Sequence, residues 1–497
     1  MRMPIAFKTL VAAAAATLAL PVLAQDPTPA GPTLELEPCR IDAGPGFDTA
    51  KALCGSFARP ENPEDPDGRS IELAVAVIPA LNVEALPDPL VLLAGGPGQS
   101  AIDSYLQVGG AFGNIQRDRP ILLVDQRGTG RSNKLDCPQP SDPTADMWSG
   151  DVEAIRTFTQ NCIDALDADL RFYTTSVAID DLDAVRAALG YGQLNLWGGS
   201  YGSRVALAYL RRYPESTRSV IIDGVVPGDE LLGPALATDA QDSLDKLFSR
   251  CAESESCSAA FPNLSADFDG LRTTLADTPV TLTVAHPQTG AMREQTINDS
   301  MLAAVVRMSS YSPATRALLP LMINEAVQGR FGMLASQASL IETQFDGLLA
   351  LGMHNSVVCS EDAPLYDEAD IDRQALANTY LGEVQIEGLN AMCDSWPRGP
   401  VDPDNGKAIV SDVPTLILSG QYDPVTPPEN GDKAAKTLSV SRHIVAPGQG
   451  HIISATGCVP RLLGEFVNTL DPEALDATCV DRLGPTPFFV STIGPTP

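Results

Sequence analysis

A serine in this sequence lies in the local pattern that activates a hydroxyl for nucleophilic attack. The pattern is GGSYG at residues 198–202, which follows the apolar run Leu194–Trp197 and precedes a helical pattern beginning near Ser203. In a strand–turn–helix context, G-x-S-x-G is typical of a nucleophile elbow, whose strained turn lifts the serine hydroxyl clear of the sheet. Only glycine lets the neighbouring chain pass so closely. We therefore predict that Ser200 is a nucleophile.

A serine hydroxyl is a weak nucleophile at neutral pH and needs an adjacent base. The chain has four histidines. His443 begins an apolar run expected to be a strand, and His286 and His354 fall in a segment expected to be helical. His451 lies in a glycine-rich loop directly after that strand, where an imidazole can reach across to Ser200. We predict that His451 is the base.

The acid that orients the base is expected between the serine and the histidine in the chain. Asp423 lies in the loop SGQYDP at 419–424, directly after the apolar run Pro414–Leu418. A carboxylate there would hold the imidazole tautomer and stabilise the imidazolium. An Asp before Pro also favours a turn by itself. The position after a strand and the spacing to His451 favour the catalytic role.

Another glycine-rich turn, AGGPG at 94–98, follows the apolar run Pro89–Leu93. Backbone N–H groups of such a turn can stabilise an oxyanion, and one donor is worth ~3–4 kcal/mol of barrier. Pro97 has no N–H, so we predict Gly96 as one donor and the N–H of Tyr201 as the other. A phosphate-binding loop is the competing use of these glycines, but no Lys-Ser/Thr pair follows. The segment DQRGTGRS at 125–132 is expected to be structural.

The elements that would position these residues form an α/β pattern. Short apolar runs bounded by Gly and Pro alternate with helical patterns, as in a mainly parallel sheet covered by helices. We expect residues 70–227 to form the first part of this core and residues 406–497 its C-terminal part. Residues 228–405 are expected to be a mainly helical cap insertion with one strand-like piece, Val280–Ala285. Residues 25–69, rich in Pro, Gly and acids, are expected to be a loosely structured lead-in.

The first 24 residues have the features of a removable export signal. Arg2 and Lys8 supply positive charge, Thr9–Leu20 is apolar, and Ala24 ends a stretch suited to cleavage before Gln25. The apolar run is shorter than the ~20 residues that span a bilayer, so a stable membrane anchor is the less favoured alternative. We expect a periplasmic or extracellular protein.

The ten cysteines agree with export to an oxidising compartment. No CxxC occurs and histidines are few, so a zinc site is not expected. Spacing alone does not fix connectivity, and reduced buried thiols are the alternative. Near neighbours suggest five sequential disulfides, which are Cys39–Cys54, Cys137–Cys162, Cys251–Cys257, Cys359–Cys393 and Cys458–Cys479.

Composition excludes some partners. The 497 residues are 44% hydrophobic and include 33 Lys and Arg against 63 Asp and Glu, for a net charge of −30. Such a surface repels phosphate backbones, so nucleic acid is not an expected partner. Cationic substrates are mildly favoured over acidic ones.

Five motifs occur in one order and together resemble a known family. They are GGPG at 95–98, DQRGTGRS at 125–132, GGSYGS at 198–203, YDPVTPP at 422–428 and GQGH at 448–451. The set resembles the prolyl iminopeptidase and tripeptidyl aminopeptidase family of serine exopeptidases. The export signal, the cysteines and residues about 380–480 are similar to the secreted bacterial tripeptidyl-aminopeptidase branch.

The resemblance implies an α/β-hydrolase fold with a helical cap (lid). It implies Ser200, Asp423 and His451 as the triad, Gly96 and Tyr201 as oxyanion donors, and no metal or organic cofactor. One departure is Ala94, where iminopeptidases usually carry His before GGPG. That difference places a strict preference for proline in doubt.

The resemblance also implies short peptides with a free N-terminus as substrates. Exopeptidases of this type must bind an α-ammonium group. The two acids that follow Cys359 closely, Glu361 and Asp362, are expected to bind it. We expect an exported serine exopeptidase that releases tripeptides, other short peptides or single residues. A secreted carboxylesterase or lipase with the same triad is the alternative, and a silent binding protein on the same scaffold is a third. The sequence does not specify the number of residues released, the side-chain preference or the oligomeric state.

Overall fold

Short apolar runs form the centre of a large sheet in the computed structural model, which describes residues 1, 34–42, 49–138, 151–345 and 347–494. The expected export signal at 1–24 therefore lies outside the described residues apart from its first residue. The strands of this sheet are β1 (Glu37–Asp42), β2 (Thr49–Pro60), β3 (Ser70–Ile78), β4 (Leu90–Leu93), β5 (Ile121–Val124), β6 (Leu194–Gly199), β7 (Thr217–Asp223), β10 (Thr415–Gly420) and β11 (Ser441–Ala446).

The sheet has the order β1-β2-β3-β5-β4-β6-β7-β10-β11. From β5 to β11 neighbouring strands are parallel, whereas β1, β2, β3 and β5 pair antiparallel in that order. The parallel strands β4, β6 and β10 are buried along their whole length because helices cover both faces. The predicted α/β-hydrolase class with a mainly parallel sheet is confirmed.

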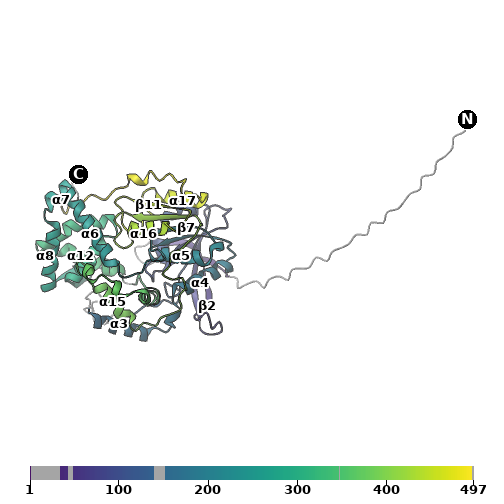
Figure 1. The fold of residues 1–497 in the computed structure, drawn as a ribbon, viewed down its shortest axis with the longest axis horizontal. Helices are drawn as coiled ribbons and strands as arrows, with labels where there is room; N and C mark the ends of the chain where they lie inside the picture. Colours follow the sequence, from purple (N-terminus) through teal and green to yellow (C-terminus); the bar gives the residue numbers. More distant parts are fainter. Residues whose placement is uncertain (2–33, 43–48, 139–150, 346, 495–497) are drawn as a thin grey trace.

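The helices that follow and cover these strands are α1 (Ala101–Val108), α2 (Gly113–Gln116), α3 (Val152–Ala165), α4 (Thr175–Ala188), α5 (Tyr201–Arg212), α16 (Pro428–Ala435) and α17 (Val459–Thr469). Short 3₁₀ turns lie at Gly109–Phe112, Leu170–Phe172, Pro214–Ser216, Ala363–Leu365, Glu368–Asp370 and Val480–Arg482. Figure 1 shows α5 and α4 against the sheet, with α17 beyond β11.

The expected loosely structured lead-in is wrong for its described part. Residues of β1 and β2 instead extend the sheet in two antiparallel pairings, and the disulfide Cys39–Cys54 joins the two strands. The segment 25–69 that contains them is rich in Pro, Gly and acids, which hid their strand pattern. Pairing with β3 supplies the backbone hydrogen bonds that the composition does not reveal.

Between β7 and β10 the chain is mainly helical. These helices are α6 (Leu236–Glu253), α7 (Glu255–Ala260), α8 (Leu264–Asp277), α9 (Asp299–Ser309), α10 (Pro313–Arg316), α11 (Leu319–Val327), α12 (Gly332–Phe345), α13 (Leu351–Glu361), α14 (Arg373–Ala377) and α15 (Val384–Cys393). Figure 1 shows α6, α7, α8 and α12 gathered beside the sheet, and these helices share a hydrophobic core of their own.

The strand-like piece predicted in this segment is β8 (Val280–Ala285), which pairs antiparallel with a second strand, β9 (Met292–Ile297). The sequence analysis missed β9 because its residues are mostly polar and only Gln295 and Ile297 are buried. A hairpin gives β8 the partner that a single strand would lack.

All five expected disulfides are confirmed, with S–S bonds at Cys39–Cys54, Cys137–Cys162, Cys251–Cys257, Cys359–Cys393 and Cys458–Cys479. The pair Cys359–Cys393 joins α13 to α15, which fixes the helix that approaches the predicted oxyanion turn. In the described residues no helix is long and apolar enough to cross a bilayer.

The C-terminal segment returns from the core to the cap (Figure 1). Phe488 is 4% exposed among the cap residues, and the Arg250 guanidinium lies 3.8 Å from its ring centroid. The Arg250 Nη2 also donates to the carbonyl of Thr486 at 2.7 Å. This segment therefore links the two parts of the molecule.

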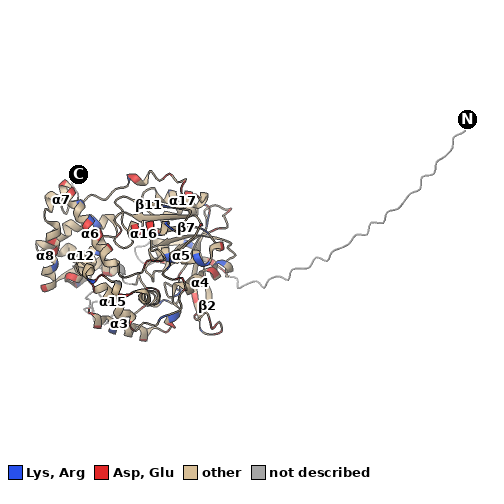
Figure 2. Ribbon diagram, viewed as in Figure 1, with Lys and Arg blue, Asp and Glu red and all other residues tan. Residues whose placement is uncertain are grey.

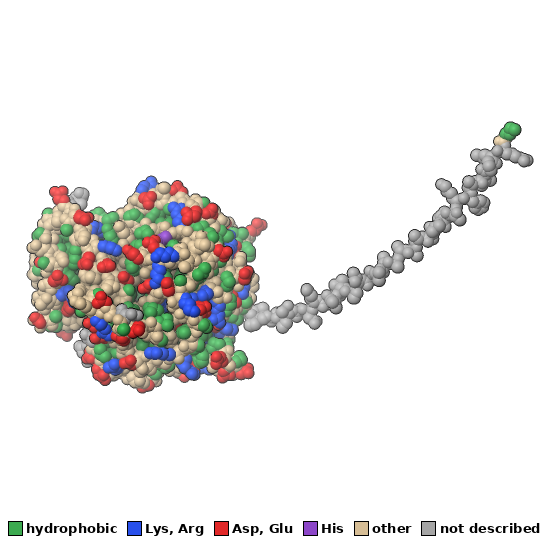
Figure 3. All heavy atoms as spheres, in the orientation of Figure 1, with side chains coloured by type: hydrophobic (Ala, Val, Ile, Leu, Met, Phe, Trp, Pro, Cys, Tyr) green, Lys and Arg blue, Asp and Glu red, His purple; other side chains and the backbone are tan. Residues whose placement is uncertain are grey.

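Acidic residues occur in both the core and the cap (Figure 2), and basic side chains are interspersed among them on the visible face (Figure 3). No group of His, Cys, Asp or Glu within the described chain is arranged to hold a metal ion.

Candidate active site

The turn at Ser200 has the strained geometry of a nucleophile elbow. Ser200 has φ of 56° and ψ of −126° between β6 and α5. A Cβ on Gly198 would lie 2.1 Å from the carbonyl oxygen of Gly202, and one on Gly202 would lie 2.0 Å from that of Leu93. Neither position tolerates a side chain, which explains the G-x-S-x-G spacing.

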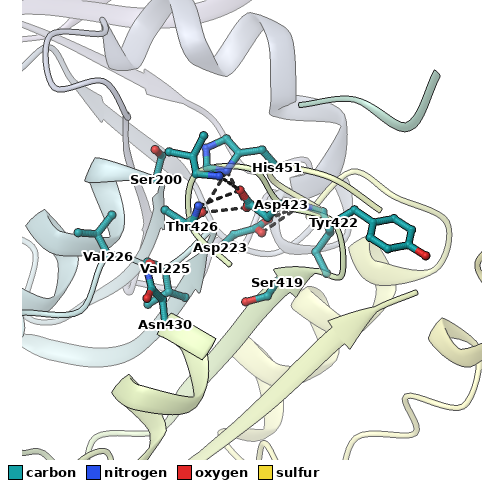
Figure 4. A network of polar contacts seen from close by, with 12 residues as sticks. Ser200, Asp223, Val225, Val226, Ser419, Tyr422, Asp423, Thr426, Asn430 and His451 are labelled. Carbon is teal, nitrogen blue, oxygen red and sulfur yellow. Dashed lines mark hydrogen bonds and ion pairs between the residues drawn. The ribbon is translucent and has the colours of Figure 1, made fainter. Parts of the chain in front are cut away.

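The structure brings the three predicted triad residues together at the carboxyl ends of β6, β10 and β11. The imidazole Nδ1 of His451 lies 2.8 Å from Oδ2 of Asp423. Figure 4 shows Ser200 beside the ring, on the side away from Asp423. Because Nδ1 faces the carboxylate, Nε2 is the nitrogen available as a base. The site thus has the parts for acyl transfer.

Electrostatics prepares His451 to accept a proton. Burial lowers the pKa of His451, but the charge and hydrogen bond of Asp423, together with the charge of Asp223, outweigh burial and raise it above its usual value. A raised pKa makes the imidazole a stronger base.

Thr426 is a site residue that the sequence analysis missed. Its hydroxyl donates to Asp423 Oδ2 at 2.8 Å and lies 3.1 Å from His451 Nδ1. The backbone N–H groups of Val425 and Thr426 both donate to Asp423 Oδ1 at 2.9 Å. An Asp followed by a hydroxyl residue three positions later is a turn signal that could have revealed this arrangement.

The predicted oxyanion turn lies against the nucleophile. A Cβ on Gly95 would be 3.1 Å from the Cβ of Ser200. Gly96 and Gly98 have φ of 109° and 108°, conformations suited to glycine. Ala350 donates its N–H to the carbonyl of Gly98 at 3.0 Å, which ties the turn to the cap.

The second predicted donor, Tyr201, is the first residue of α5. The N–H groups in the first turn of a helix have no partner within the helix and are suited to stabilising negative charge. The oxyanion role of Gly96 and Tyr201 stays a prediction that this placement supports.

The structure places both expected ammonium binders, Glu361 and Asp362, among buried residues, so their role in binding a substrate stays a prediction that this placement does not favour. Asp362 is fully buried, and both of its oxygens accept from Arg204 Nη1, at 2.9 and 3.0 Å. Glu361 is buried too and accepts from the N–H of Thr175 at 2.5 Å. It lines a small cavity of ≈ 20 Å³ beside α5 and α4. Both carboxylates are thus bonded to partners within the core.

A different acid, Asp239 on α6, lies close enough to the triad loop to interact electrostatically with Asp423. One turn further along α6, the hydroxyl of Ser243 donates to the carbonyl of Tyr422, the residue before Asp423. Burial, with the negative charges of Glu230, Asp242, Asp423 and Glu429, raises the pKa of Asp239 to about 7.

The carboxylate of Asp239 forms no hydrogen bond or ion pair with another described residue. The neighbouring Glu230, in contrast, is paired with Lys433 at 2.9 Å. Asp239 is thus a half-buried acid without a cation, in a region that favours positive charge. With 63 acids in the chain, no local sequence signal distinguishes it.

Comparison with known proteins agrees with this geometry. A family described as the alpha/beta hydrolase fold matches residues 88–275, which include Ser200, and a family described as TAP-like protein matches residues 378–479, which include Asp423 and His451.

Similar proteins span most of the chain. Serine protease Hip1 of Mycobacterium tuberculosis is 27% identical over 437 residues, which are 82% of this chain and 83% of that protein. Tripeptidyl aminopeptidase of Streptomyces coelicolor is 23% identical over 464 residues, 87% of this chain and 84% of that protein. Proline iminopeptidase of Mycobacterium smegmatis, a solved structure, covers 84% of this chain and 98% of its own with 16% identity and a TM-score of 0.38. From the family matches and the sequence relatives, the chain is a hydrolase of the α/β fold, and in sequence it resembles the tripeptidyl aminopeptidase and proline iminopeptidase family.

Proposed function

We propose that the protein is an exported serine exopeptidase that releases short peptides, such as tripeptides, from the free N-termini of peptides. The observation that carries this proposal is the unpaired carboxylate of Asp239 beside an assembled triad. A peptide N-terminus is cationic at neutral pH, since the α-amino pKa is about 8. An acid near the triad but outside it is the group that an aminopeptidase needs.

The triad residues supply the steps of amide hydrolysis. Ser200 Oγ attacks the scissile carbonyl carbon while its proton passes to His451 Nε2, and Asp423 stabilises the resulting imidazolium. The N–H groups of Gly96 and Tyr201 stabilise the oxyanion. The C–N bond then breaks as His451 gives the proton to the leaving amine, which leaves an acyl-enzyme on Ser200.

Water completes the cycle. His451 takes a proton from the water that attacks the acyl carbon, and returns a proton to Ser200 Oγ as the ester bond breaks. The peptide acid is released with its N-terminus still protonated.

The position of Asp239 would set where the N-terminus of the substrate lies. An extended tripeptide reaches roughly 10 Å from the scissile bond, so its ammonium lies away from the reacting carbonyl. Asp239 acts on Asp423 electrostatically but belongs to the cap. The cap therefore recognises the N-terminus, and the core carries out the reaction.

Export is part of the proposal. Five disulfides are stable in an oxidising compartment and rare in the cytosol. Removal of residues 1–24 would release the chain to the periplasm or the medium. N-terminal sequencing of the exported protein should begin at Gln25.

The test compares Ala-Pro-Ala and Ala-Ala-Phe amides, each free or N-acetylated, with Pro and Ala amides and a p-nitrophenyl ester. We expect cleavage of free tripeptidyl amides, weak cleavage of acetylated ones and no activity in Ser200→Ala. Cleavage of the ester with every amide untouched would refute the peptidase and favour a carboxylesterase.

Asp239→Asn tests the ammonium site. A hydrogen bond to a charged group contributes about 1.5–3 kcal/mol, so KM for free tripeptidyl amides should rise roughly 10- to 150-fold while kcat changes little. Asp245→Asn, an exposed change on the same helix with the same loss of charge, should leave KM unchanged. Equal effects of both variants, or no effect of Asp239→Asn, would exclude Asp239.

The pH dependence follows from the same residue. Asp239 is ionised above its pKa of about 7, whereas the substrate amine loses its charge above a pKa of about 8. Binding of a free tripeptide to Ser200→Ala should therefore be tightest between these values and weaken on both sides. A dissociation constant that stays constant from pH 6 to 9 would contradict the ion pair.

A further inference from the structure

We propose that Asp223 is a positioning residue for the hydrolytic reaction, because its carboxylate holds the backbone that follows His451. The inference rests on the proposed triad, but not on the peptide specificity. Asp223 ends β7, lies between the nucleophile elbow and the histidine loop, and is fully buried.

The carboxylate of Asp223 accepts hydrogen bonds from the loop that follows His451. Ile453 donates its N–H to both oxygens, at 3.0 and 2.9 Å. Ser454 donates its N–H at 2.7 Å and its hydroxyl at 2.6 Å to Oδ2. Charge-assisted hydrogen bonds of this kind are about twice as strong as neutral ones. The two residues they hold lie two and three positions after the base.

The residue between them and the base needs such support. Ile452 has φ of 66°, a conformation that β-branched residues rarely adopt. Such backbone strain persists only where surrounding contacts impose it. The hydrogen bonds to Asp223 are those contacts, and the strained residue sets the direction in which His451 leaves the loop.

Asp223 also contacts the nucleophile turn. Its carbonyl accepts the N–H of Ser200 at 2.9 Å, so one residue holds the base through its side chain and the serine through its backbone. Figure 4 shows Asp223 beneath the triad, close to Asp423 and Thr426. The relative position of Ser200 and His451 is therefore set through Asp223.

The charge of Asp223 has a second consequence. The titratable groups around the histidine are Asp423 on the β10 loop, Asp223 on β7, and Tyr311 from the cap, whose ring centroid lies 5.2 Å from that of His451. The negative charges of Asp423 and Asp223 both favour the imidazolium. Burial raises the pKa of Asp223 to about 6, so the carboxylate is charged at neutral pH.

The test uses the rate at which a fluorophosphonate labels Ser200, since this reaction needs the triad and no particular substrate. The readouts are the plateau rate above pH 8 and the midpoint of the acidic limb, which reports the protonation of His451. Asp223→Asn should label at least tenfold more slowly and have its midpoint at lower pH. Slow labelling from misplacement alone would not move the midpoint.

Asp125→Asn is the matched control. Asp125 is also fully buried at a strand end, and it accepts hydrogen bonds from Ser100 and from the N–H groups of Ile102 and Arg131. The charge of Asp125 does not contribute to the raised pKa of His451, which comes from Asp423 and Asp223. We expect this variant to lose stability and to keep the wild-type midpoint.

Ser454→Ala separates the two effects and provides a milder variant if Asp223→Asn does not fold. It removes the bond that the hydroxyl donates to the carboxylate and the bond that it accepts from Trp197 Nε1 at 2.9 Å, but keeps the charge of Asp223, so labelling should slow three- to tenfold. Wild-type labelling by folded Asp223→Asn, or by Ser454→Ala, would overturn the proposal, as would an equal midpoint shift in Asp125→Asn. Absence of labelling in the wild-type protein would instead refute the triad itself.

Discussion

Removing the hydroxyl of Thr426 should impair the base without disturbing the fold. Thr426→Val keeps the shape and the backbone N–H that donates to Asp423 Oδ1, and deletes only the hydroxyl that donates to Oδ2 at 2.8 Å. That hydroxyl also lies 3.1 Å from His451 Nδ1. Asp423 Oδ2, the oxygen that orients the imidazole, would then have His451 Nδ1 as its remaining side-chain donor.

The magnitude follows from the type of bond. A hydrogen bond to a charged group is worth about 1.5–3 kcal/mol, and each 1.36 kcal/mol is a factor of ten in rate. If the bond orients Asp423 for the transition state, Thr426→Val should lower kcat/KM roughly 10- to 150-fold. The loss should appear in kcat, because the hydroxyl faces the triad and not the expected ammonium site.

The assay is hydrolysis of a free tripeptidyl amide, with thermal unfolding measured on the same samples. Thr426→Ser is the matched control, because it keeps the hydroxyl and removes the methyl group, and it should retain activity within a few-fold. The reasoning fails if Thr426→Val is as active as the wild-type protein. It also fails if both variants lose equal activity, since the methyl group would then be the important part.

Three further changes test the packing around the site. Gly224→Ala would place a Cβ 2.9 Å from His451 Cε1 at a φ of 64°. The fall in kcat should be larger than the loss of thermal stability accounts for, and an unchanged kcat would contradict the close approach. Asp362→Asn leaves the buried Arg204 without its partner, so urea unfolding should show a loss of about 3–5 kcal/mol, whereas a loss below 1 kcal/mol would mean that the pair is solvated. Phe488→Ala should cost about 3–5 kcal/mol because the ring is buried in the cap; an unchanged melting temperature would show that the C-terminal segment does not stabilise the cap.

The elbow at Ser200 and the loops that carry Asp423 and His451 could be predicted from local sequence, because local backbone geometry requires particular residues. The elbow needs glycine at positions 198 and 202 for steric reasons, and those contacts arise within a few residues. Asp423 and His451 each follow an apolar strand, and parallel strands place their carboxyl ends at one edge. The near-neighbour spacing of the cysteines also suggested the five disulfide pairs that the structure has.

The acids could not be assigned in this way. Glu361 and Asp362 have the composition expected of an ammonium site, but Arg204, more than 150 residues away in the chain, neutralises Asp362. Asp239 has no distinctive neighbours in sequence and becomes unusual only because the cap places it near Asp423 without a cation. Whether a carboxylate is paired depends on which distant side chains fold against it.

The sequence by itself determined the class of fold, the elbow at Ser200 and the loops that carry Asp423 and His451, and it suggested the disulfide pairs, because turns, apolar periodicity and short loops act over neighbouring residues. Only the tertiary structure decided that Thr426 and Asp223 support the base, that β1 and β2 join the sheet, and which acid lacks a partner. These features depend on contacts between strand ends and cap helices that are far apart in the chain. Burial and charge pairing, which fix the chemistry of such groups, arise only when those elements pack together.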